Sequence, residues 1–117
     1  MSEPGGDRRI DYVELSVEDI ARTRDFYGAA FGWSFTDYGP DYCEFFDGRL
    51  KGGLAHGTPR GGGGPLVILF AVDLEGTQRR IEEAGGKISK PIFRFPGGRR
   101  FHFEDPEGYE LAVWSDR

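Results

Sequence analysis

The chain has 117 residues, of which 38% are hydrophobic and 15% aromatic, and its formal net charge is −5. This length supports one domain with its own core and excludes two independent domains. The acidic charge argues against a nucleic-acid partner, because phosphate binding requires clustered Lys and Arg side chains, and no stretch approaches the roughly 18 apolar residues of a membrane span.

Residues 1–9 are polar and contain Gly and Pro, so we expect a disordered N-terminus and a single domain over residues 10–117. This segment lacks the apolar run of a secretory signal peptide. The single Cys43 has no partner for an internal disulfide. Together these features predict a cytoplasmic protein.

The first predicted element is a strand over residues 12–17, in which apolar and polar side chains alternate. We expect the apolar set to pack against helices, because it has the composition of a buried face. The other set should face a cavity: Tyr12, Glu14 and Ser16.

A predicted helix follows, and its pattern is written twice in the chain. Asp19-Ile20 recurs as Asp73-Leu74, and Thr, Ala and Gly follow at the same intervals, with every pair 54 positions apart. Each Asp is a good helix N-cap, and glycines end both segments. One half of the chain therefore looks like a copy of the other.

Three short extended runs follow each predicted helix, and a further run at 66–72 precedes the second helix, as the strand at 12–17 precedes the first. Turn signals such as Asp47-Gly48 and residues 105–108 separate the runs. Each half thus reads strand, helix, strand, strand, strand, in modules at about 10–57 and 65–117. The Gly-rich joint at 58–64 lacks the Gly-Lys-Ser/Thr of a phosphate loop.

This doubled βαβββ pattern resembles the vicinal oxygen chelate superfamily, which includes glyoxalase I, bleomycin- and fosfomycin-resistance proteins and extradiol dioxygenases. The resemblance is carried by Val-Glu-Asp-Ile-Ala-Arg-Thr-Arg-Asp-Phe-Tyr at 17–27 and Asp-Pro-Glu-Gly-Tyr-Glu-Leu at 105–111. The closing run 95–114 is similar to a small bacterial subgroup related to lactoylglutathione lyase. The resemblance implies an α+β fold in which two βαβββ modules form curved mixed sheets around a cavity, and a homodimer. Closure of the cavity within one chain is the alternative.

In metal-dependent relatives, each module supplies two metal ligands, usually His or Glu. The motif register carries these positions over to Tyr12, Glu44, Val67 and Ala112. A transition metal needs three or more converging N, O or S ligands, which Val and Ala do not supply. We therefore expect no metal and no cofactor. A relocated metal site would have to draw on His56, His102, Glu14, Glu44 and Glu110.

Glu14 is the residue that we expect to do chemistry, if the protein is an enzyme. A carboxylate inside a strand among aromatic rings is partly desolvated and can take a proton from carbon or oxygen. The alternative for Glu14 is a salt bridge across the sheet or the dimer. Ligand-binding side chains are expected at Tyr12, Ser16, Trp33, Glu44, Val67, Leu69, His102, Glu110, Ala112 and Trp114.

These expectations favour a small-molecule-binding protein, and first a metal-independent lyase or isomerase that acts on a small carbonyl or hydroxy compound. The second hypothesis is binding without turnover of an aromatic or cationic compound, as in bleomycin-resistance proteins, because acidic grooves attract cations. A metal-dependent lactoylglutathione lyase is the third. The basic cluster of Arg94, Arg99 and Arg100 is more typical of a solvated turn than of an anion site.

Overall fold

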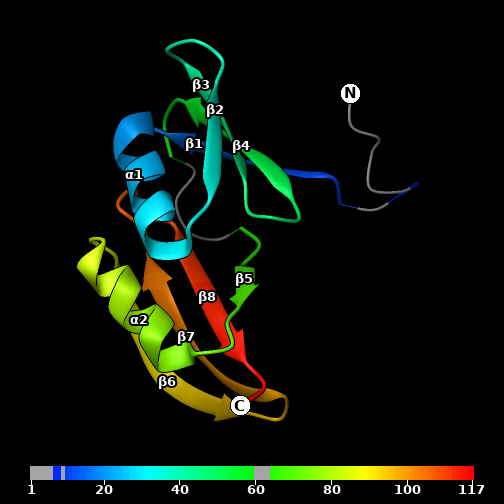
Figure 1. Cartoon of the computed structure of the whole chain (residues 1–117), viewed down its shortest axis with the longest axis vertical. Coiled ribbons are helices and arrows are strands. Elements are labelled where there is room, and N and C mark those ends of the chain that lie inside the picture. The colour runs from blue at the N-terminus through cyan, green and yellow to red at the C-terminus, as the bar shows by residue number, and fades with distance from the viewer. Residues whose placement is uncertain (1–6, 9, 60–63) are drawn as a thin grey trace.

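The computed structural model describes residues 7–8, 10–59 and 64–117. Its first module contains β1 (Tyr12–Val17), α1 (Ile20–Phe31), β2 (Ser34–Asp37), β3 (Tyr42–Phe46) and β4 (Lys51–His56). The second module contains β5 (Val67–Phe70), α2 (Leu74–Glu83), β6 (Lys87–Phe95), β7 (Gly98–Glu104) and β8 (Glu110–Ser115). The predicted α+β fold with two βαβββ modules is confirmed (Figure 1).

Two expectations fall partly outside this description. The disordered N-terminus was expected at 1–9 and the joint at 58–64, and residues 1–6, 9 and 60–63 lie outside the described residues. No helix among the described residues is long and apolar enough to cross a bilayer.

The two sheets repeat one another strand for strand. Their orders are β1-β4-β3-β2 and β5-β8-β7-β6, so β1 and β5 lie at corresponding edges. Strand β1 runs parallel to β4, and β5 runs parallel to β8, while all the other pairs are antiparallel. The sheets are therefore mixed, as expected.

The internal repeat has a physical cause at the helix N-termini. The Asp19 carboxylate accepts a hydrogen bond from Arg22 N at 2.9 Å, and the Thr23 hydroxyl donates to the Asp19 carbonyl at 2.9 Å. In α2, Asp73 and Thr77 make the matching bonds at 3.0 and 2.8 Å. The repeated Asp and Thr thus satisfy main-chain groups that a helix start leaves unpaired.

The core lies between the helices and the inner faces of the sheets. Helices α1 and α2 contact each other and lie along the same side of the molecule, at the left in Figure 1. One buried cluster joins them to β7 and β8, and a second, containing Cys43, lies under the first sheet. Trp33 connects the two clusters, since its ring stacks on Tyr27 at 4.5 Å and on Phe45 at 4.6 Å. The two modules therefore share one continuous core.

Candidate functional site

The open face of the first sheet carries a row of side chains that points away from the helices. The alternation expected in β1 is confirmed, because Val17 is fully buried in the core and Leu15 packs against the same cluster. Glu14 lies beside Gly53 on β4, and Gly53 lies beside Glu44 on β3. The two carboxylates therefore lie on either side of a glycine on one face.

Two tyrosines join these carboxylates into a hydrogen-bonded group, which we call the tyrosine–carboxylate cluster: Tyr12, Glu14, Tyr42 and Glu44. The Tyr42 hydroxyl donates to Glu14 Oε1 at 2.9 Å. The Tyr12 hydroxyl lies 2.8 Å from the Tyr42 hydroxyl and 3.3 Å from Glu44 Oε2. Lys51 adds a positive charge 3.9 Å from Glu44. The cluster thus links β1 to β3 across β4.

Both cluster tyrosines keep their protons well above neutral pH. Burial raises the pKa of Tyr42, and its hydrogen bonds to Tyr12 and Glu14 raise it further. Burial also raises the pKa of Tyr12, and the charge of Glu44 adds to this, while the hydrogen bond with Tyr42 acts in the opposite direction. The two phenols therefore remain the hydrogen-bond donors that hold the cluster carboxylates in place.

Gly53 makes room for this cluster. A Cβ atom at this position would lie 1.9 Å from the Tyr42 hydroxyl and 2.9 Å from the Tyr12 hydroxyl. Neither Gly53 nor Tyr42 is among the site residues predicted from the sequence. Two signals were available: Tyr42 is in phase with Glu44 on β3, and paired glycines inside a strand indicate a close approach.

The strand register corrects the site residues expected on β5. Ile68 lies beside Ala112 and Phe70 beside Trp114, whereas Val67 lies beside Leu111. The expectation that Val67 shares a face with Ala112 is therefore wrong, because side chains alternate along a strand. Leu69 lies beside Val113, likewise on the helix side. The repeat of 54 residues already pairs Glu14 with Ile68.

The same register shows which residues correspond across the two modules. Ala112 pairs with Ile68 on β5, just as Gly53 pairs with Glu14 on β1. The structural counterpart of Ala112 is thus Gly53 rather than Glu44. Both positions carry small residues without a metal-binding atom.

The open face of the second sheet is aromatic, and we call Phe70, Phe93, Phe95 and Trp114 the aromatic wall. The Trp114 ring meets Phe70 at 5.1 Å and Phe95 at 6.2 Å, both edge to face. The Arg100 guanidinium lies over Phe93 at 5.3 Å and over Phe95 at 5.7 Å. A hollow of about 370 Å³ opens here, lined by Ile68, Phe95, Gly97, Arg100 and Trp114.

His102 lies next to this wall. The residue is 4% exposed, and Nδ1 lies 2.8 Å from Glu110 Oε2. In the sheet His102 pairs with Ala112 on β8 and with Lys90 on β6. Nε2 is buried and has no hydrogen-bond partner. The expected site residues His102 and Glu110 are therefore in direct contact.

A groove of about 1330 Å³ runs between the two modules and brings most of the expected site residues together. It is lined by Tyr12, Glu14, Trp33, Val67, Leu69, His102, Glu110 and Trp114. Three expected residues do not line it. Ala112 is fully buried, the Ser16 carbonyl accepts a hydrogen bond from the Tyr109 hydroxyl, and Glu44 lies behind Tyr12, whose hydroxyl it contacts.

The donor atoms of this groove do not fit the metal that the resemblance implies. Within residues 7–8, 10–59 and 64–117, no three His, Cys, Asp or Glu side chains lie close enough to share a metal ion. Glu14 and Glu44 have tyrosines between them, and His102 is paired with Glu110. A transition-metal site needs more converging ligands than either pair supplies.

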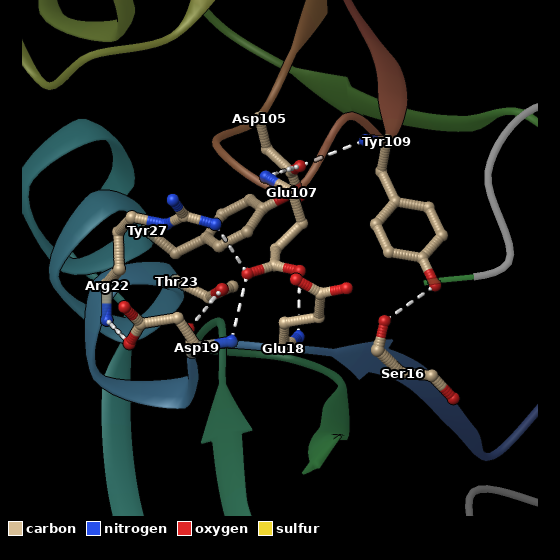
Figure 2. A network of polar contacts seen from close by, with 9 residues as sticks. All are labelled: Ser16, Glu18, Asp19, Arg22, Thr23, Tyr27, Asp105, Glu107 and Tyr109. Atoms are coloured by element: carbon tan, nitrogen blue, oxygen red, sulfur yellow. Dashed lines mark hydrogen bonds and ion pairs between the residues drawn. The ribbon is translucent and has the colours of Figure 1, made fainter. Parts of the chain in front are cut away.

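The turn between β7 and β8 holds the two modules together (Figure 2). Its Glu107 carboxylate accepts hydrogen bonds from Glu18 N at 2.8 Å and Asp19 N at 3.0 Å, and Arg22 Nη2 lies 2.7 Å away. Burial acts to raise the pKa of Glu107, but these hydrogen bonds and the Arg22 charge outweigh it and lower the pKa. Glu107 thus binds the N-terminus of α1 as an anion.

Asp105 holds the turn itself in shape. Its Oδ1 accepts hydrogen bonds from Glu107 N at 2.9 Å and Tyr109 N at 3.0 Å. Its Oδ2 accepts a hydrogen bond from the Tyr27 hydroxyl on α1 at 2.8 Å. The Asp-Pro-Glu-Gly-Tyr motif, which carried part of the resemblance, is therefore a structural contact between the modules.

A family model described as the Glyoxalase/Bleomycin resistance protein/Dioxygenase superfamily matches residues 9–113. The chain belongs to this superfamily. It is 31% identical over 110 residues to anthracycline biosynthesis protein DauV of Streptomyces sp. (strain C5), and 33% identical over 124 residues to anthracycline biosynthesis protein DnrV of Streptomyces peucetius. These matches cover 89% and 88% of this chain but 40% and 45% of the relatives, so the chain spans less than half their length.

Solved structures share the fold at lower sequence identity. A glyoxalase/bleomycin resistance protein/dioxygenase family enzyme from Burkholderia phytofirmans PsJN is 16% identical with a TM-score of 0.83, over 92% of this chain and all of that one. The fosfomycin resistance protein FosX from Listeria monocytogenes is 18% identical with a TM-score of 0.80, over 92% of each chain. At such identities the likeness supports the fold alone.

Proposed function

We propose that this chain binds a planar aromatic small molecule on the aromatic wall, where Phe70 and Trp114 border the groove between its modules. The observation that carries the proposal is the gathering of Phe70, Phe93, Phe95 and Trp114 on one open sheet face. The names of DauV and DnrV refer to anthracyclines, which are planar polycyclic compounds, and this supports the same ligand class.

Exposure of the wall gives the ligand a source of binding free energy. Phe70 is 50% exposed and Ile68 is 45% exposed, although both lie on a sheet face next to the groove. Contiguous exposed apolar surface marks a binding site in folded proteins. A flat ring system would bury this surface and would stack on Trp114.

A second candidate function is proton transfer by Glu14, in a metal-independent lyase or isomerase that acts on a carbonyl or hydroxy compound. The specific observation is that Tyr42 orients one Glu14 oxygen while Glu14 stays in the groove wall. The Tyr42 hydroxyl would then hold Glu14 in position while its carboxylate takes a proton from the substrate.

We also infer that a second copy of the chain covers the open face. Large apolar residues at the β1 and β5 edges are exposed, including Ile10 at 81% and Val72 at 66%. A groove of about 1330 Å³ is larger than the roughly 300–1,000 Å³ of a usual ligand pocket, as expected for a site that a partner completes. Sedimentation equilibrium tests this inference, and a monomer at all concentrations contradicts it.

The binding proposal is tested by calorimetric titration with naphthalene and anthraquinone derivatives, together with ligand-induced thermal shifts. We expect Trp114→Ala and Phe70→Ala to weaken binding at least tenfold, because each removes a large contact surface. The matched control is Tyr38→Ala, which removes an aromatic residue that is 61% exposed outside the groove. Binding that survives both wall substitutions contradicts the proposal.

The same titrations separate the two candidate functions. If Glu14 is a base, Glu14→Gln abolishes turnover of a carbonyl or hydroxy compound while binding persists. If the protein only binds its ligand, no compound that binds is converted, and Glu14→Gln changes affinity alone.

A further inference from the structure

Two buried nitrogens of the described chain lack hydrogen-bond partners, and both lie on β7. They are Arg100 Nε and His102 Nε2. Because the two residues are separated by one position on a strand, their side chains lie on the same face. Arg100 pairs with Trp114 and His102 pairs with Ala112, so this face is the one that bears the aromatic wall.

These atoms have complementary hydrogen-bonding roles. In the tautomer in which His102 Nδ1 donates to the Glu110 carboxylate, 2.8 Å away, Nε2 is an acceptor. Arg100 Nε is a donor at any ordinary pH. Next to the aromatic wall, the acceptor His102 Nε2 and the donor Arg100 Nε therefore lie two residues apart on β7, and neither has a hydrogen-bond partner.

Such groups are unfavourable in a folded protein unless something satisfies them, since burial removes them from water. A phenylalanine at 102 would fill the same space next to Phe93 without this cost. Arg100 is half-buried and lies over two rings, which differs from the solvated turn that the sequence suggested. Both nitrogens are thus available for hydrogen bonds to a bound molecule.

We propose that His102 and Arg100 recognise oxygen substituents on the planar ligand, so that the ligand class is a hydroxylated aromatic compound. A ligand hydroxyl donates to His102 Nε2, and a ligand oxygen accepts from Arg100 Nε. Glu110 is a positioning residue, because it holds the proton on Nδ1. The charged groups beside His102, besides Glu110, are Arg100 on the same face of β7 and the exposed Lys90 on β6, and the ligand would reach the ring by displacing the Lys90 side chain. This inference rests on the proposed function.

The first test compares 2-naphthol with 2-methoxynaphthalene, which keeps the oxygen acceptor but has no proton to donate. We expect the wild-type chain to prefer 2-naphthol, and His102→Phe to reduce that preference about three- to tenfold, the effect of one neutral hydrogen bond. The matched control is His56→Phe, which replaces the other histidine, exposed at the end of β4, and keeps the wild-type preference. The difference in hydrophobicity between the two probes cancels in this comparison.

The second test addresses Arg100. Arg100→Gln should weaken binding of both probes, because each carries an oxygen that accepts a hydrogen bond. Arg99→Gln is the control, since Arg99 is paired with Glu75 on α2 and should leave both affinities unchanged. Equal affinities for Arg100→Gln and wild-type chains overturn the role of Arg100.

A third measurement needs no variant and so does not depend on whether His102→Phe folds. With ¹⁵N-histidine labelling, NMR should show His102 protonated on Nδ1, and 2-naphthol should shift Nε2 more than 2-methoxynaphthalene does. An unchanged Nε2 resonance with bound 2-naphthol overturns the inference but leaves planar-ligand binding intact. If neither probe binds, the proposed function and this inference both fail.

Discussion

The Tyr27 hydroxyl donates a hydrogen bond to Asp105 Oδ2 at 2.8 Å, which connects α1 to the β7–β8 turn across 78 residues of sequence. Both groups are buried. Burial raises the pKa of Asp105 above its ordinary value, and the hydrogen bonds from Tyr27 and main-chain amides offset only part of this rise. This contact positions the first module against the second, and with them the two sides of the groove.

Tyr27→Phe should lower the free energy of unfolding by about 1–3 kcal/mol, because it leaves a buried carboxylate with one hydrogen bond fewer. Urea denaturation followed by circular dichroism measures the change. Tyr38→Phe is the control, since Tyr38 is 61% exposed and should change stability by less than about 0.5 kcal/mol. Equal stabilities of the Tyr27→Phe and wild-type chains contradict the role of this bond.

Glu107→Gln should destabilise the fold in a pH-dependent way. The folded pKa of Glu107 is below its ordinary value, so its charge contributes stability above the unfolded pKa, and this contribution is lost as pH falls through the folded pKa. We expect a loss of about 1–2 kcal/mol at pH 7, the range of a lost helix cap. As the pH falls through the folded pKa the variant and the wild type should converge, and denaturation over a series of acidic pH values checks this. A pH-independent difference argues against a charged Glu107.

Gly53→Ala should disrupt the tyrosine–carboxylate cluster, because the added Cβ would lie 1.9 Å from the Tyr42 hydroxyl. We expect a loss of about 1–3 kcal/mol, as for overpacking of a filled site. Gly28→Ala is the matched control with the opposite sign. Its Cβ would meet Phe35 at an ordinary 3.5 Å inside α1, so about 0.5–1 kcal/mol of stability should be gained. Thermal denaturation of both variants measures these two changes, and an unchanged stability of Gly53→Ala contradicts the prediction.

Stability should fall at alkaline pH because the buried Tyr27 hydroxyl stays protonated in the folded chain. Burial raises the pKa of Tyr27 well above its ordinary value of 10.0, and the charge of Asp105 adds to this. Because the folded pKa exceeds the unfolded one, stability is fully present below pH of about 10 and is lost as pH rises further. The loss should be shallower in Tyr27→Phe than in the wild type. Tyrosinate absorbance and denaturation over the same pH range provide the measurement.

The order of elements could be read from the sequence because local chemistry repeats in it. The helix-capping residues Asp19 and Asp73 and the helix-ending Gly32 act within a few residues of chain, so a linear pattern reveals them. The faces of β1 followed for the same reason, since its polar and apolar side chains alternate.

The faces of β5 were harder to assign, because residues 66–70 are all apolar and alternation has no visible phase there. The contacts of Glu107 were beyond local patterns for a different reason: it lies 88 residues from Asp19 along the chain. The pairing of His102 with Glu110 needed the register of β7 against β8, which single-strand periodicity does not contain.

Trp33 and Trp114 are the two tryptophans of the chain, and they occupy unlike surroundings. Both line the groove, but Trp33 stacks between Tyr27 and Phe45 where the modules join, whereas Trp114 meets Phe70 and Phe95 on the aromatic wall. Each tryptophan can therefore serve as a separate fluorescence probe. In the Trp114→Phe variant, fluorescence of Trp33 reports separation of the two modules. In the Trp33→Phe variant, fluorescence of Trp114 reports ligand binding at the aromatic wall.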